Sequence, residues 1–99
     1  MKITKPPKHL STESKKLWKS IVFEYLIEDS AGLQILQTAL SSRDIAEEAR
    51  RTIKTDGMMI DGATGKVRHP LLPVVRDHQN LFLKSMRHLN LDIEPGGKS

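Results

Sequence analysis

Apolar residues recur at the spacing of an amphipathic helix in three segments of the chain. The first segment follows Ser11 and Thr12, either of which can cap a helix N-terminus. Its apolar side chains return every three or four positions from Leu17 to Leu26, which is the repeat of an α-helix with one buried face. We therefore predict a first helix that begins at about residue 12.

The second helix is predicted to be long, from Asp29 and Ser30 to about Asp56, where Gly57 can adopt the left-handed conformation that ends a helix. Its apolar positions change direction near the middle and form two stripes on roughly opposite sides, at about 100° per residue. The helix either breaks at Ser41 and Ser42, where the stripe changes side, or continues and serves two interfaces. We expect the continuous helix, whose first stripe meets helices of its own subunit and whose second stripe faces a neighbouring copy. The first stripe comprises Leu33, Leu36 and Leu40, and the second comprises Ile45, Ala49 and Ile53.

Turn-forming residues after the long helix predict a small β-hairpin at about residues 58–68. Two short candidate strands flank an Asp-Gly…Thr-Gly segment, in which Gly65 can supply a positive φ. His69 and Pro70 then open a last amphipathic helix, because proline is tolerated in the first helical turn, and Asn90 can cap its end. The predicted fold is mainly α, with three helices, a long central one, and a hairpin before the last.

The chain is predicted to form one domain with two short terminal segments. Residues 1–10 lack periodicity and contain a Pro-Pro pair, which indicates a flexible basic arm. Residues 11–91 hold the predicted helices and the hairpin. Residues 92–99 have too few apolar side chains to fold alone and are expected to be a flexible tail.

The composition limits the core that this chain can build alone. Only 37% of its 99 residues are apolar, with one Trp, one Tyr and two Phe, so we expect surface from another copy to complete it. The lack of cysteine excludes disulfides and thiolate zinc sites. No apolar run approaches the ~18 residues that cross a bilayer, and no signal-peptide apolar stretch follows the N-terminus. We expect a soluble intracellular protein.

Positive charge is concentrated at the N-terminal end. Residues 1–20 contain six lysines and one glutamate, whereas the other 79 residues hold ten basic and eleven acidic side chains. Such a segment suits a polyanion, most simply DNA, because lysines contact phosphates without reading bases. A solvated, flexible N-terminus is the alternative. The predicted DNA-contacting residues are Lys5, Lys8, Lys15, Lys16 and Lys19.

Four cations of the long helix are second candidates for DNA contact. Acidic residues lie between them, and Glu47 stands four positions before Arg51, in the favourable order of a helical ion pair. An ordinary solvated helix face is the alternative interpretation. The second candidates are Arg43, Arg50, Arg51 and Lys54.

The sequence holds no pattern that indicates catalysis. Its four histidines are scattered, and none stands four residues from another on a helix, the spacing of a metal pair. Lys66 follows a glycine, as in a phosphate-binding loop, but Val67 stands where that loop needs Ser or Thr. We therefore expect no enzyme activity, no metal and no cofactor.

Individually common residues occur in a distinctive order along most of the chain. A proline-leucine-serine opening precedes a tryptophan, alanines precede the glycine after the long helix, and a leucine-asparagine-leucine unit precedes a proline at the end. In this order they resemble the small subunit of bacteriophage terminase, in its short, mainly helical family. The departures are Asn90 in place of a glycine and the absence of an arginine after Pro95. The residues that carry the resemblance are Pro7, Leu10, Ser11, Trp18, Asp29, Leu33, Ala46, Ala49, Ile53, Gly57, Gly65, His69, Pro70, Leu89, Leu91 and Pro95.

The resemblance implies a non-catalytic DNA-packaging subunit. Small terminase subunits form homo-oligomeric rings, recognise viral genomic DNA and recruit or regulate the large subunit, which holds the ATPase and the nuclease. We accordingly expect a ring-like homo-oligomer that binds double-stranded viral DNA and the large subunit, in the cytoplasm of the infected bacterial host, without membrane contact. Leu91 and Ile93 are the candidate docking residues for the large subunit, unless they pack back on the last helix.

Two other functions are consistent with the sequence. One is a small helical DNA-binding regulator, dimeric rather than ring-forming. The other is a structural oligomer that binds no DNA, in which the basic arm only maintains solubility. Stoichiometry separates the regulator from the terminase subunit, and DNA binding separates both from the structural oligomer.

Overall fold

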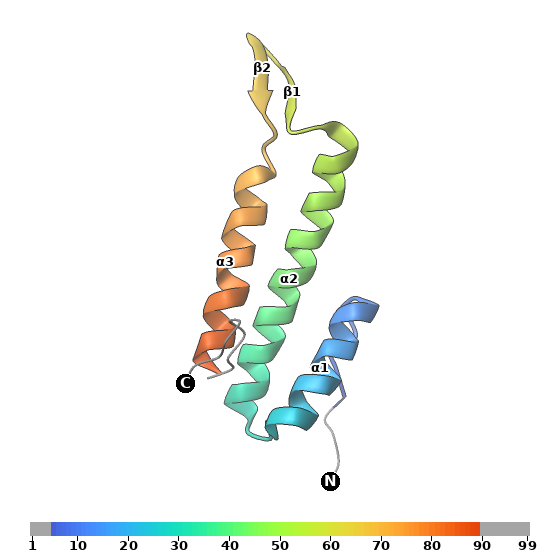
Figure 1. Cartoon of the computed structure of the whole chain (residues 1–99), viewed down its shortest axis with the longest axis vertical. Helices are drawn as coiled ribbons and strands as arrows, with labels where there is room; N and C mark the ends of the chain where they lie inside the picture. The colour runs from blue at the N-terminus through green and yellow to red at the C-terminus, as the bar shows by residue number, and fades with distance from the viewer. Residues whose placement is uncertain (1–4, 90–99) are drawn as a thin grey trace.

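A computed structural model of the chain describes residues 5–89. The order of elements is α1 (Thr12–Tyr25), α2 (Ser30–Asp56), β1 (Met59–Gly62), β2 (Gly65–Arg68) and α3 (Leu72–His88). Figure 1 shows α2 and α3 running side by side in opposite directions, with α1 packed beside the first half of α2. The prediction of three helices with a hairpin before the last is confirmed, and the central helix is continuous over 27 residues.

Side chains at the helix ends explain where α1 and α2 begin. Ser11 caps α1, since its Oγ accepts a hydrogen bond from the Ser14 N–H at 3.1 Å. Asp29 caps α2 in the same way, by accepting from a backbone N–H of the first turn. Gly57 ends α2 with a φ of +91°, as a glycine permits, but its ψ of 155° is extended and not left-handed helical as expected.

A leucine in the left-handed conformation turns the chain between α1 and α2. Leu26 has φ +53° and ψ +47°, and its N–H and that of Ile27 both donate to the Val22 carbonyl. This conformation costs a residue with a β-carbon about 1–2 kcal/mol. The turn returns Ile27 to the core, where it is 9% exposed, while the side chain of Leu26 stays in solvent.

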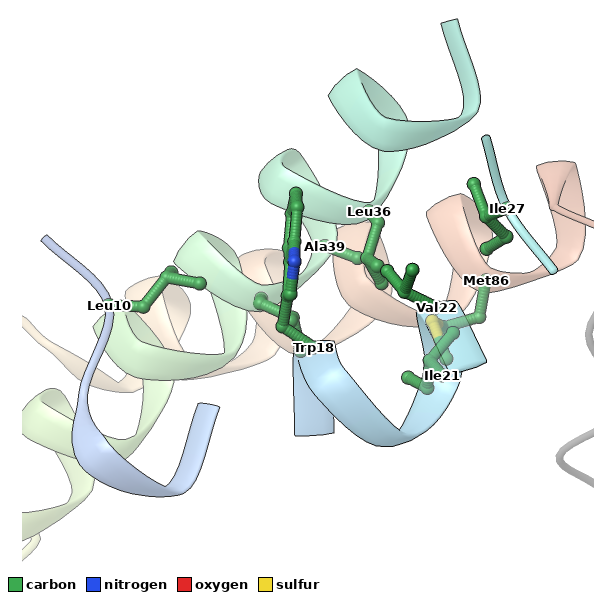
Figure 2. Close-up of a cluster of buried hydrophobic side chains, with 9 residues drawn as sticks. Leu10, Trp18, Ile21, Val22, Ile27, Leu36, Ala39 and Met86 are labelled. Carbon is green, nitrogen blue, oxygen red and sulfur yellow. The ribbon is translucent and has the colours of Figure 1, made fainter. Parts of the chain in front are cut away.

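One hydrophobic core joins the three helices (Figure 2). Leu10, assigned by sequence to the flexible arm, belongs to this core: it is 4% exposed, and its N–H donates to the Pro7 carbonyl. The folded unit therefore begins before residue 11, because Leu10 is buried in the same hydrophobic cluster as Trp18. The buried side chains are Leu10, Trp18, Ile21, Val22, Ile27, Leu36, Ala39, Leu40 and Met86.

The second stripe of α2 is largely buried within the chain itself. Ala49 and Ile53 are 5% and 8% exposed, whereas Ile45 is 44% exposed. The hairpin reverses the chain, so that α3 runs back along this half of α2, and Arg50 bonds to Gln79 across the pair. The prediction that the stripe faces a neighbouring copy is therefore wrong for Ala49 and Ile53, and only Ile45 remains available.

The hairpin extends beyond the helices, as Figure 1 shows. Its antiparallel register pairs Met59 with Arg68 and Gly62 with Gly65, whose φ of +127° confirms the expected turn glycine. Within the described residues its strands are exposed except for Ile60, which is half-buried. The hairpin thus does not pack on the helices, although a lone two-stranded ribbon is only marginally stable in water.

Candidate nucleic-acid interface

Two of the three lysines of α1 lie away from its buried face, and the third borders it. Ser14, Trp18, Ile21 and Val22 are buried, whereas Lys16 and Lys19 are exposed and Lys15 is half-buried. Lys5 and Lys8 are exposed in the segment before the helix. None of the five lysines forms an ion pair within residues 5–89, so each is available to a phosphate.

Asp44 of α2 fixes the start of α1. Its Oδ2 accepts the Ser11 N–H at 2.7 Å, and its Oδ1 accepts the hydroxyls of Ser11 and Ser14 at 2.7 and 2.6 Å. Ser14 is fully buried, so its hydroxyl needs this acceptor. We call these three residues the Asp44 cluster, and it holds the lysine-bearing helix in a fixed orientation on α2.

The Asp44 cluster has a defined charge state. Burial raises the pKa of Asp44, but the hydrogen bonds from Ser14 and Ser11, together with the charge of Arg43, outweigh burial and hold this pKa below the usual value of an aspartate. The carboxylate is therefore ionised at neutral pH and accepts the bonds at full strength.

Arg43, a second candidate for DNA contact, is engaged within the chain. Its Nη1 donates to the Ser14 Oγ at 3.2 Å and lies 3.7 Å from the Asp44 carboxylate. Its Nη2 lies 3.5 Å from Glu13, and only a quarter of the side chain is exposed. This arginine neutralises the Asp44 cluster and is not presented to a ligand.

Of the three other candidate cations on α2, one is paired with neighbouring side chains and two are unpaired within the described residues. Arg50 donates to Glu47 at 2.6 Å and to Gln79 at 2.8 Å, so it links α2 with α3. Arg51 and Lys54 are exposed and form no ion pair within the described part of the chain. The α2 cations therefore do not form a single surface.

A second polar contact closes the base of the hairpin. The imidazole of His69 is 5% exposed, and its Nδ1 accepts the Leu71 N–H at 3.0 Å. The proton must then be on Nε2, which donates to Asp56 at 2.9 Å. The bond joins the end of α2 to the start of α3, and the His69 N–H adds a bond to the Met58 carbonyl at 2.7 Å.

Sequence reasoning missed the Asp44 cluster and the His69–Asp56 bond. Ser11 was identifiable as a cap, but its second partner lies 33 residues away on another helix. His69 was noted only as a helix start, whereas α3 begins at Leu72 and the His69 ring accepts the N–H of Leu71 just before it. The interaction with Asp56 depends on the hairpin geometry, which the sequence pattern does not specify.

Three residues with a predicted role, Asn90, Leu91 and Ile93, lie outside the described residues. Within residues 5–89 no group of three or more His, Asp or Glu could hold a metal ion. No helix in this part of the chain has both the length and the apolar character needed to cross a bilayer.

Comparisons of the chain with protein-family models, curated proteins and solved structures give no match.

Proposed function

We propose that this chain is a phage terminase small subunit, which binds viral DNA, forms a ring-like homo-oligomer and recruits the large ATPase–nuclease subunit. The observation that carries the proposal is the unpaired lysine side of α1, held in place by the Asp44 cluster. The three helices and the hairpin occur in the order in which the residues of the terminase resemblance stand along the chain.

DNA binding follows from the charge and from the rigidity of α1. Lys16 and Lys19 stand three positions apart on a helix, so they face the same direction and can contact neighbouring phosphates. A helix with a fixed orientation loses little further entropy on binding. In an oligomer the weak contacts of each subunit would act together, which raises the overall affinity.

Assembly is supported by apolar side chains that the single chain leaves in solvent. At the C-terminal end of α1, Phe23 is 64% exposed, Tyr25 48% and Leu26 62%. Ile45 of α2 is the exposed member of the predicted interface stripe. Burial of such side chains between identical subunits would remove this apolar surface from water, which favours assembly.

Native mass spectrometry combined with DNA titration tests the proposal. A single closed oligomer larger than a dimer is expected, whereas a dimer would favour the DNA-binding regulator. Affinity for a duplex should fall with salt at a log–log slope of about 0.9 per phosphate contacted. Replacement of the five N-terminal lysines by glutamine should reduce that slope, and an oligomer that binds no duplex even at low salt would favour the structural oligomer.

A further inference from the structure

The exposed side of α3 carries a row of four polar side chains, three of them cations, that is separate from the lysines of α1. Arg76, Asn80, Lys84 and Arg87 are all exposed, and their spacings of four, four and three residues place them on one helix face. The opposite side of α3 packs into the core through Met86, Phe82 and Leu89. The polar row therefore points away from the rest of the chain.

Arg68 of the hairpin extends this row at its N-terminal end. Arg68 and Arg76 line one surface cavity of about 360 Å³, together with His69, Pro70, Leu72 and Pro73. The acidic side chain on this side of α3 is Asp77, which lies 3.2 Å from the Arg76 Nε. Both groups of that pair are about two-thirds exposed, so the pair is weak and a phosphate can replace the carboxylate.

We propose that Arg68, Arg76, Lys84 and Arg87 form a second contact surface for the phosphates of double-stranded DNA. We call it the α3 surface. The inference rests on the proposed function, in that the protein must bind DNA, and it adds a site that the N-terminal lysines do not include. Lys84 and Arg87 form no ion pair within residues 5–89, so they are the clearest phosphate ligands of the row.

The dimensions of the row suit a duplex. At a rise of about 1.5 Å per residue, Arg76 and Lys84 are about 12 Å apart along the helix axis, close to the width of the major groove of about 12 Å. A helix that crosses this groove can thus contact phosphates on both sides of it. Asn80 would lie between the two cations, over the groove.

The same arrangement argues against a lipid surface as the ligand. A helix that binds at a membrane interface inserts an apolar face between the lipids. The apolar face of α3 is occupied by the core, through Phe82 and Met86, and cannot insert. The exposed face offers charge without a neighbouring apolar stripe of comparable length.

The α3 surface and the α1 lysines belong to helices on opposite sides of α2 in Figure 1. A duplex bound at one surface would therefore not lie against the other surface of the same subunit in the same orientation. The two surfaces should contribute separately to the salt dependence, and a variant that lacks the N-terminal lysines should keep part of it.

Two charge-matched variants test the α3 surface. The first is Lys84→Gln/Arg87→Gln on α3, and the second is Gln34→Glu/Thr38→Glu on the exposed side of α2, at positions given no role in DNA contact. Each lowers the net charge from +4 to +2, the first by removing two cations and the second by adding two carboxylates. A third variant, Lys84→Arg/Arg87→Lys, keeps the charge on α3. Circular dichroism confirms that each full-length variant is folded, and anisotropy measures binding to a labelled duplex over a range of salt concentrations.

The α3 variant should lose about 1.8 from the log–log salt slope for each subunit engaged, since each lost phosphate contact accounts for about 0.9. The α2 variant and the charge-preserving variant should keep the wild-type slope. An unchanged slope in the α3 variant, or an equal loss in the α2 variant, would overturn the α3 surface while leaving the proposed DNA binding intact. A wild-type protein that does not bind the duplex would overturn both, and binding to phosphatidylserine vesicles alone would assign the cations to a membrane.

Discussion

Replacement of Asp44 by asparagine should destabilise the fold more than its partial exposure suggests. The amide keeps one acceptor oxygen, but its NH₂ group faces hydroxyl and N–H groups that donate to the carboxylate in the wild type. The buried hydroxyl of Ser14 loses a charged acceptor, and Arg43 loses the charge beside it. A buried donor left without a partner costs about 1–3 kcal/mol, so we expect the free energy of unfolding to fall by about 2–3 kcal/mol.

Urea denaturation measures this loss, with Trp18 as a fluorescent reporter because its side chain is 3% exposed in the core. Protein concentration must be held constant, since assembly adds to the apparent stability. The matched control is Asp77→Asn on α3, where, among residues 5–89, the carboxylate pairs with the adjacent Arg76 at the surface. We expect that control to change stability by at most about 0.5 kcal/mol. Equal losses in the two variants would contradict the role given to the Asp44 cluster.

The difference between wild type and Asp44→Asn should also depend on pH. Folding lowers the pKa of Asp44 from its ordinary value, so between the folded and the unfolded pKa the unfolded state binds more protons. Stability from this group is therefore fully present above the unfolded pKa of about 3.9 and is lost as the pH falls through the folded pKa. The two proteins should converge in stability under acid, and a difference that stays constant down to the lowest pH would refute the electrostatic explanation.

Three further sets of variants test the turn, the interface and the tail. Leu26→Gly should raise the free energy of unfolding by about 0.5–1 kcal/mol in urea denaturation, because glycine adopts a positive φ without strain; Leu26→Ala, which keeps the strain, should give no gain. Ile53→Asp should unfold the chain in circular dichroism, whereas Ile45→Asp should keep the helices and lower the native mass of the oligomer. If Ile45→Asp keeps the wild-type mass, this part of α2 is not an interface. Removal of residues 92–99 should weaken capture of the large subunit and preserve oligomer mass and DNA binding; full capture would exclude Ile93 from docking, and loss of the oligomer would favour packing of the tail on α3.

Local chemistry explains why the element boundaries could be predicted. Ser11, Asp29 and Gly57 act on the backbone of the turn in which they stand, so their effect is visible in a few neighbouring residues. The continuity of α2 was the preferred of two interpretations, because the apolar stripe changes side at Ser41 and Ser42, where a break of the helix was the alternative.

Contacts between distant residues could not be predicted in this way. The burial of Ala49 and Ile53 depends on the direction in which the hairpin returns the chain, and periodicity shows only that these residues share a face. The bonds of Asp44 depend on how α1 crosses α2. The cations of α3 were present in the sequence, but a count of charge by segment concealed them, because Asp77 and the acidic residues of the tail balance them.

The bond between His69 and Asp56 joins the chain at the base of the hairpin, where α2 ends and the approach to α3 begins. The His69 N–H adds a bond to the Met58 carbonyl at the same place. Contacts of the hairpin residues 59–68 are therefore not needed to hold α2 and α3 together. Exposed turn tips accept insertions most readily. The turn at Ala63 and Thr64, which is exposed and extends beyond both helices, is therefore the place where a fluorophore or a short peptide tag could be attached without disturbing α1 or α3.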